Sequence, residues 1–204
     1  MSEDFAGMYR SSFEAVYGRP PARADGIGER ELVAAENRLG GRLPEALRAF
    51  YLTVGASPRV TSAHNELTAP AGLEVEEGSV RFCDGHQSVC DWWVRLDSGD
   101  DPHVEHRMNG CNYDAGACSA FLRYFLNMQA LMGGLNHGGS RDEDDAVLGT
   151  VRAEWEHVCE QEGLAIWQKN GMLIGFPEGS GLLFCAARTE EDRVWLESHF
   201  GFEF

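Results

Sequence analysis

Basic residues are scarce in this sequence. Its 204 residues include 17 Lys and Arg against 33 Asp and Glu, which gives a formal net charge of −16 and an isoelectric point near 4.7. Because nucleic-acid backbones and anionic membrane surfaces are themselves negative, this balance disfavours both as partners. It favours a basic protein or substrate instead.

Long hydrophobic runs are missing as well. The longest apolar stretch, residues 121–132, is interrupted by Arg123, Asn127 and Gln129, whereas a membrane helix needs about 20 consecutive apolar residues. Residues 1–10 are acidic and lack the basic region and apolar run of a secretory signal. We therefore expect a cytoplasmic protein that does not span a membrane.

Cysteine is also sparse. The chain has six, which are Cys83, Cys90, Cys111, Cys118, Cys159 and Cys185. Without a secretory signal, so few cysteines predict reduced thiols rather than a disulfide framework. The first four form two pairs with histidines between them, but six residues separate the partners of each pair. Structural zinc sites use pairs separated by about two to four residues, so we predict no metal site.

Short catalytic strings do not occur. Neither Gly-x-Ser-x-Gly nor His-Glu-x-x-His is present, and the seven histidines are scattered. The glycine-rich segment 133–140 lacks the lysine of a phosphate-binding loop and follows a predicted helix rather than a strand. The sequence therefore predicts no catalytic residue and no cofactor, although a hydrolytic triad assembled from distant segments stays open as an alternative.

The chain does have enough apolar sequence for one compact domain with a sizeable core, since 43% of its residues are hydrophobic and 25% are charged. Apolar residues spaced three and four apart predict three amphipathic helices, over 2–17, 29–39 and 44–54. A glycine follows each of them, as expected at the end of a helix.

Residues 61–112 change character. Short runs of Val, Trp and Phe, separated by turns that contain glycine, predict a β-meander. In its clearest strand, 88–96, Trp92 and Trp93 point to opposite faces, so at most one of them lies on the core side of a two-layer sheet. Helical spacing returns over 120–132 and predicts a mostly buried helix that covers the sheet.

The last part of the chain has a pattern of its own. Residues 133–145 are glycine-rich and then acidic, which predicts a flexible loop or a boundary. Apolar spacing and turn signals then predict four elements: a helix through Val147, Val151, Trp155 and Val158, a hairpin that turns at Asn170-Gly171, a strand over 182–187, and a helix from Thr189 to near Phe200. We interpret this part as an additional α-β unit.

The second and third predicted helices carry a distinctive order of residues. From Glu36 to Gly55 they read Glu-x-x-Leu-Gly-x-x-Leu-Pro-x-x-Leu-Arg-x-Phe-Tyr-x-x-Val-Gly. This string resembles the opening of the SUKH superfamily, bacterial toxin-immunity proteins related to fungal regulators of cell-wall synthesis. Segments 82–104 and 119–128 resemble the strand pair and the covering helix of the same family, so the resemblance spans about residues 26–131.

The resemblance implies an α+β fold whose sheet is flanked by helices, and it covers the middle one of the three parts that we expect. A SUKH-like core with a mostly antiparallel sheet flanked by helices (26–132) is preceded by an N-terminal helix and linker (1–25), and is followed by a helix, hairpin and helix packed on it (133–204). The resemblance also implies a non-enzymatic protein that binds a cognate toxin, often a nuclease, and neutralises it. The family has no general catalytic residue. Its recurrent positions look structural and are matched here by Leu39, Gly40, Leu43, Pro44 and Phe50.

Acidic clusters and a tryptophan supply the candidate partner-binding residues, which are Glu74, Glu76, Glu77, Trp92, Asp97, Asp100 and Asp101. A further acidic run covers 142–145. Each cluster fits a solvated face that keeps the protein in solution. The sharper interpretation is that a cluster imitates nucleic-acid phosphate against a basic toxin, with an exposed tryptophan as anchor unless a second layer of helices buries it. A small enzyme and a regulatory scaffold stay open as alternative functions.

Overall fold

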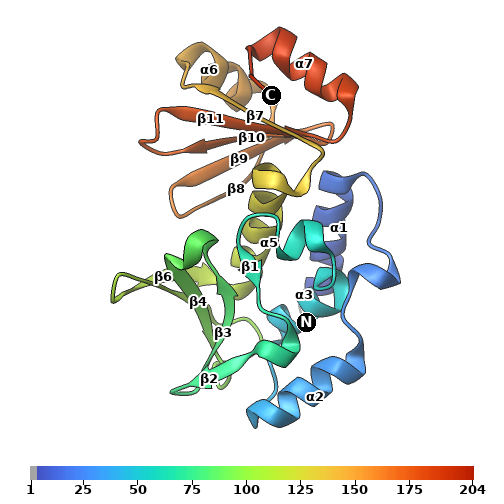
Figure 1. Cartoon of the computed structure of the whole chain (residues 1–204), viewed down its shortest axis with the longest axis vertical. Helices are drawn as coiled ribbons and strands as arrows, with labels where there is room; N and C mark the ends of the chain where they lie inside the picture. The colour runs from blue at the N-terminus through green and yellow to red at the C-terminus, as the bar shows by residue number, and fades with distance from the viewer. Residues whose placement is uncertain (1–3) are drawn as a thin grey trace.

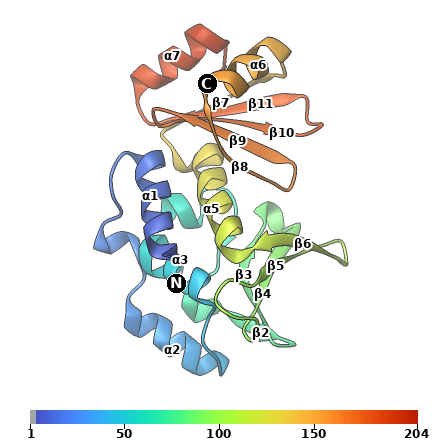
Figure 2. The same ribbon diagram turned by 180° about the vertical axis from the view of Figure 1, so that it is seen from behind.

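Two antiparallel β-sheets and the helices packed against them make up this α+β fold, which the computed structural model describes for residues 4–204 (Figures 1 and 2). The predicted class, an α+β fold with an antiparallel sheet flanked by helices, is confirmed. We call the first sheet, built from residues 66–117, sheet A, and the second, built from residues 137–187, sheet B.

Four helices form the N-terminal part, and each of the first three ends at a glycine. They are α1 (Phe5–Tyr17), α2 (Glu29–Leu39), α3 (Glu45–Val54) and the short α4 (Pro58–Thr61). Gly18 and Gly40 follow α1 and α2 in the left-handed conformation, with φ of 71° and 75°, which glycine adopts without steric cost. The predicted start of the first helix after Ser2 lies outside the described residues, and Asp4 caps the helix by accepting a hydrogen bond from the Gly7 amide.

No helix among residues 4–204 is both long and apolar enough to cross a membrane.

Sheet A is the predicted meander. Its strands are β1 (Glu66–Leu67), β2 (Glu74–Glu76), β3 (Ser79–Asp84), β4 (Cys90–Arg95), β5 (His103–Met108) and β6 (Cys111–Ala117). Their order is β1-β3-β4-β5-β6, and β2 pairs with the other end of β3. Short 3₁₀ turns connect parts of this region and the N-terminal helices, at Arg23–Asp25, Pro70–Gly72 and His86–Ser88. One face of the sheet carries the apolar residues Val80, Phe82, Trp92 and Val94 into the core.

Helix α5 (Cys118–Gln129) lies at the centre of the molecule and continues into the wider turn η4 (Ala130–Gly134). Its Phe121 contacts Trp92 of sheet A at a ring-centroid distance of 5.6 Å, and its Phe125 contacts Phe50 of α3 at 6.2 Å. Asp101 supplies its N-terminal cap from the loop before β5. The predicted covering helix is therefore confirmed, although its regular part ends at Gln129.

Sheet B is made by the last part of the chain. Its strands are β7 (His137–Asp142), β8 (Glu156–Gln161), β9 (Leu164–Lys169), β10 (Met172–Pro177) and β11 (Leu182–Ala187), in the order β7-β11-β10-β9-β8. Two helices belong to this part, α6 (Asp145–Glu154) and α7 (Glu190–Phe200). The predicted hairpin is present, because Asn170 and Gly171 both have positive φ, 53° and 82°, as a two-residue turn requires.

Both faces of sheet B are buried. Leu164 and Ile166 point into the core that contains α1, α3 and α5, whereas the alternating Ala165 and Trp167 point into a second core beneath α6 and α7. Figures 1 and 2 show the same layering, with α6 and α7 on one side of the sheet and α1 and α5 on the other. One sheet is thus shared by two hydrophobic cores.

Two predictions for the C-terminal part are wrong. The expected loop 133–145 contains β7, which pairs with β11 through main-chain groups and needs no apolar side chains. Its Gly139 lets the C-terminal end approach, since a Cβ there would lie 2.6 Å from the Glu203 carbonyl oxygen. The expected helix through Val158 ends at Glu154, because Trp155 is already extended, with φ −107° and ψ 148°, and leads into β8.

Candidate functional site

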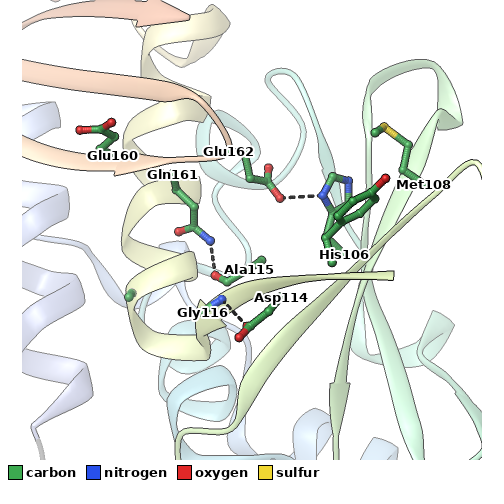
Figure 3. Close-up of a pocket in the computed structure, with 10 residues that line it drawn as sticks. His106, Met108, Asp114, Ala115, Gly116, Glu160, Gln161 and Glu162 are labelled. Atoms are coloured by element: carbon green, nitrogen blue, oxygen red, sulfur yellow. Dashed lines mark hydrogen bonds and ion pairs between the residues drawn. The ribbon is translucent and has the colours of Figure 1, made fainter. Parts of the chain in front are cut away.

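A cleft of about 640 Å³ lies between the β5–β6 hairpin of sheet A and the β8–β9 turn of sheet B (Figure 3). Its volume falls in the range of about 300–1,000 Å³ that is usual for ligand sites. Polar and apolar side chains share its lining, which consists of His106, Met108, Tyr113, Asp114, Ala115, Gly116, Ala120, Glu160, Gln161 and Glu162.

The β8–β9 turn places a carboxylate over sheet A. Glu162 and Gly163 both have positive φ, 53° and 77°, and form a tight two-residue turn. The turn lets Glu162 Oε1 accept a hydrogen bond from Trp92 Nε1 at 2.9 Å and approach His106 Nδ1 at 3.0 Å. The Glu162 and His106 side chains are only 22% and 14% exposed, so this contact joins the two sheets in a partly buried place.

His106 is held on three sides. Its ring stacks on Trp92 with centroids 5.0 Å apart and an interplanar angle of 16°, and its Nδ1 faces Glu162. Its Nε2 is covered by protein and has no hydrogen-bond partner among residues 4–204. The tautomer with the proton on Nδ1 donates to Glu162 and leaves a lone pair on Nε2, which avoids a buried, unpaired N–H.

The chemistry of this pair is limited by its covered nitrogen. A carboxylate that orients an imidazole is one half of a hydrolytic site, but the other nitrogen must reach a nucleophile or a substrate. Here Nε2 does not open into the cleft, and none of the described residues that line the cleft is Ser, Thr or Cys. The geometry suits a contact that fixes the two sheets and presents the second carboxylate oxygen of Glu162 to the cleft.

Strand β6 forms the other wall. The Gln161 side-chain amide donates a hydrogen bond to the Ala115 carbonyl oxygen, and Asp114 accepts one from the Gly116 amide at 2.8 Å. The Gly116 hydrogen bond, together with His103 Nδ1 at 2.9 Å, lowers the pKa of Asp114 below its usual value. Tyr113 is 50% exposed beside the cleft. The wall therefore combines a charged group with an exposed aromatic ring.

Two of the predicted acidic clusters meet at one end of sheet A. Glu74 and Glu76 are exposed on the edge strand β2, and Glu77 stands in the β2–β3 turn. The Leu96 amide donates to the Gly78 carbonyl at 3.1 Å, which brings that turn beside the loop that carries Asp97. We call Glu74, Glu76, Glu77, Asp97 and Asp100 the acidic end of sheet A.

Arg95 is one of the basic neighbours of the acidic end. Its side chain makes two hydrogen bonds to Asp97, both 2.9 Å long, and these lower the pKa of Asp97. Asp100 is exposed in the same loop. A hollow of about 500 Å³ on the outer face of sheet A then runs from Glu77 past Arg95 to Asp114 of β6. The acidic end and the β6 wall of the cleft therefore border one continuous surface.

Trp92 is a correction to the predicted site. It is 3% exposed and Trp93 is 7% exposed, so neither is a free surface anchor. Trp92 lies under Phe121 of α5, while the ring of Trp93 is covered by the Arg107 guanidinium, 4.1 Å from its centroid. None of the helices within residues 4–204 covers the outer face at this position, and the neighbouring Arg107 covers the ring instead.

Two further acids of the predicted clusters, Asp101 and Asp144, serve the fold. Asp101 accepts hydrogen bonds from the Ser119 amide at 2.7 Å and from the Ser119 hydroxyl at 2.6 Å, which caps α5. In the run 142–145, Asp144 caps α6 by accepting from the Ala146 and Val147 amides. These carboxylates stabilise helix N-termini and are not free for a partner.

The residues considered for zinc are dispersed. Cys83 and Cys118 are buried, Cys111 is exposed at the start of β6, and all the cysteines of residues 4–204 are free thiols. Among these described residues no group of three or more His, Cys, Asp or Glu side chains is arranged to hold a metal ion.

Sequence reasoning did not find the contact between His106 and Glu162. His106 was one of several scattered histidines, and no role was predicted for Glu162. The signal was present in the dipeptide Glu162-Gly163, a two-residue turn between polar and apolar runs. This signal is masked in the sequence because the spacing of apolar residues predicts a helix through Val158, whereas residues 156–161 form β8.

Comparison of the chain with family models, with curated proteins and with solved structures finds no match in any of the three. The SUKH resemblance therefore stays a prediction from the string in α2 and α3 and from segments 82–104 and 119–128.

Proposed function

We propose that this chain is a cytoplasmic, non-enzymatic binding protein of the SUKH type, which neutralises a cognate basic toxin by covering its active surface. A nuclease is the toxin class that fits the charge best, because its substrate is a polyanion. The observation that carries the proposal is the acidic end of sheet A, where carboxylates from β2, from the β2–β3 turn and from the β4–β5 loop are gathered.

Charge at this end is only partly balanced within the protein. Arg95 pairs with Asp97, and Arg81 approaches Glu74 at 3.7 Å, but Glu76 and Glu77 have no ion-pair partner among residues 4–204. An exposed group of this kind, on a chain with a formal charge of −16, attracts a basic surface and accelerates its association.

The strand edge adds a contact surface to the charge. Val75 is 41% exposed between Glu74 and Glu76, so the edge of β2 offers an apolar side chain flanked by carboxylates. Charged residues on an edge strand also discourage pairing with a second copy of the same sheet. Such an edge suits a partner of opposite charge.

A small enzyme is the second candidate, and the cleft is the observation that favours it. A carboxylate–imidazole pair, Glu162 and His106, stands at a cleft of about 640 Å³. We rank it second because His106 Nε2 is covered, which leaves the pair without a nitrogen that reaches the cleft.

The test compares two charge-matched triple variants. The first carries Glu76→Gln, Glu77→Gln and Asp97→Asn at the acidic end; the second carries Glu143→Gln, Glu156→Gln and Glu191→Gln, three exposed positions in the C-terminal part. The partner in the test is a basic toxin sought among the products of the neighbouring genes, and the readouts are its association rate with the chain and its activity in the presence of the chain.

We expect the acidic-end variant to associate with the toxin about tenfold more slowly than wild type in dilute salt. The difference should be smaller near 0.5 M salt, where the Debye length falls to about 4 Å. The variant should also inhibit the toxin less than wild type does. The control variant should stay near wild type. Equal association of both variants would contradict the proposed surface, and turnover of a small molecule that depends on His106 would favour the enzyme.

A further inference from the structure

We infer that the open edge of β6 is a docking site for an extended, arginine-bearing segment of the partner, which adds to sheet A as a further strand and directs a side chain into the cleft. The inference deepens the proposed function and rests on it in one respect, namely that the partner is basic.

Strand β6 is the last strand of sheet A and pairs only with β5 among the described residues. Met108 and Cys111 flank the two-residue turn Asn109-Gly110, whose φ values are 53° and 76°. Such flanking residues form a hydrogen-bonded pair, and the pattern alternates along an antiparallel ladder. The main-chain groups of Asn112 and Asp114 therefore point away from β5, toward the open side.

The part of the edge near the hairpin tip lacks most of the usual protection against strand pairing. Natural edge strands are kept short, carry charges or proline, or are twisted by bulges. Strand β6 runs over Cys111–Ala117 without lysine or proline, and its charged residue, Asp114, and its irregular register opposite His103–Glu105 lie toward the end away from the tip. Its first four residues are all exposed, and the tip of the β5–β6 hairpin stands clear of the other elements in both views of the fold. A long open edge of this kind is suited to strand addition.

One internal contact already imitates a neighbouring strand. The Gln161 side-chain amide donates to the Ala115 carbonyl oxygen, a main-chain acceptor of β6. A partner segment would continue this pattern toward the hairpin tip with its own main-chain groups, and its side chains would alternate between the outer hollow and the cleft.

The cleft beside the edge suits a guanidinium group. Oε1 of the Glu162 carboxylate contacts Trp92 Nε1 and His106 Nδ1, and no partner of its Oε2 is found among residues 4–204. The half-exposed ring of Tyr113 lies near, its centroid 6.0 Å from that of His106. A carboxylate next to an aromatic face binds arginine by an ion pair and by stacking. Sheet A already contains this arrangement, since Arg107 stacks on Trp93 and pairs with Glu105.

Charge and continuity favour a basic segment over a second copy of this chain. Two copies joined along β6 would bring together two surfaces of a chain with a formal charge of −16. The hollow from Glu77 to Asp114 also connects the β6 edge with the acidic end, so one basic partner can reach both.

The experiment uses the full chain and a blocked synthetic peptide, Thr-Arg-Val-Arg-Thr, with a control peptide in which citrulline replaces both arginines. Binding is followed by NMR through the Trp92 indole N–H, which donates to Glu162, and through hydrogen exchange of the Asn112 and Asp114 amides. The Trp92 signal is identified by its loss in Trp92→Phe.

Four variants separate the contributions. Asn112→Pro removes the outward N–H and is tolerated on an edge strand, while Asn112→Ala keeps that N–H and removes only the side chain. Glu162→Gln removes the charge but keeps an acceptor for Trp92, and Glu191→Gln removes an exposed charge on α7. Melting temperatures of all four variants establish that they are folded.

We expect the arginine peptide to shift the Trp92 signal saturably and to slow exchange at Asn112 and Asp114. Asn112→Pro should weaken binding about fivefold and Glu162→Gln about threefold, with Asn112→Ala and Glu191→Gln near wild type. Equal binding of the citrulline peptide, equal binding by Asn112→Pro, or a dimer of the free chain would each overturn the inference. None of these results depends on the acidic-end variants, which leave β6 unchanged.

Discussion

Replacing Gln129 by methionine should remove a large share of the stability of this protein. Gln129 is fully buried in α5 and uses every hydrogen-bonding position of its side-chain amide. Its Oε1 accepts from the His64 amide at 2.8 Å and from the Asn65 amide at 2.9 Å, and its Nε2 donates to the Val60 carbonyl at 2.9 Å and to the Asn65 carbonyl at 2.6 Å. One side chain thus holds the segment between α4 and β1.

The magnitude follows from the main-chain groups that methionine would leave unpaired. Val60 and Asn65 are buried and supply three of the four groups. A buried polar group without a partner costs about 1–3 kcal/mol, so three groups cost about 3–9 kcal/mol, and local rearrangement with water entry favours the lower part of that range. We expect a loss of about 3–5 kcal/mol from a total stability that is about 5–15 kcal/mol for most domains.

Urea unfolding, followed by tryptophan fluorescence and circular dichroism, measures this loss. The matched control is Gln168→Met, the same chemical change at a side chain whose single hydrogen bond, to the Ala15 carbonyl at 2.8 Å, is exposed. The control should lose about 1 kcal/mol or less. If Gln129→Met loses no more than Gln168→Met, the side chain does not hold the segment and the reasoning is wrong.

Two further predictions concern titratable groups. Hydrogen bonds from Arg19 lower the pKa of Asp25, so this carboxylate stabilises the folded state above the unfolded pKa of about 3.9, and the stabilisation is lost as the pH falls through the lower folded pKa. Wild type should therefore lose free energy of unfolding in acid more steeply than Asp25→Asn. Equal slopes of the two proteins in urea unfolding from pH 2 to 6 would contradict this. Burial raises the pKa of Cys159 and of Cys185 to about 12, whereas Cys111 is exposed. Iodoacetamide at neutral pH should therefore label Cys111 first, as followed by peptide mass spectrometry. Labelling of Cys185 in the folded protein would contradict its burial.

Elements governed by local chemistry could be predicted from the sequence. Gly18 and Gly40 end their helices because a left-handed residue is needed at those positions, and Asn170-Gly171 turns the β9–β10 hairpin for the same reason. The bounds of β11 match the predicted strand 182–187. In each case the signal and the structure it specifies lie within a few residues.

The strands β7 and β8 could not be predicted in this way. The residues of β7 have low β-propensity, and only pairing with β11 and with Glu203 makes this segment a strand. Trp155 and Val158 continue the spacing of the preceding helix by coincidence, since Trp155 reaches the second core from an extended backbone. Tertiary pairing outweighs the local pattern at both places.

For the candidate site, the sequence predicts which residues are exposed acids, but it does not predict which residues lie beside them in the fold. Glu76, Glu77 and Asp97 are exposed acids, but the register of Ser79 opposite Arg95 is what brings them to one end of the sheet. Nothing local indicates that Asp101 caps α5 or that Trp92 reaches Glu162. Those contacts join segments far apart in the chain.

The burial of sheet B on both faces constrains how the proposed binding specificity could change during evolution. Ile166 fits one core and Trp167 the other, so recombination that replaced everything after residue 132 would have to supply side chains matched to the old helices α1 and α5. New specificity is easier to acquire by substitution in solvent-facing turns, such as residues 77–78 and 97–99, whose side chains belong to neither core.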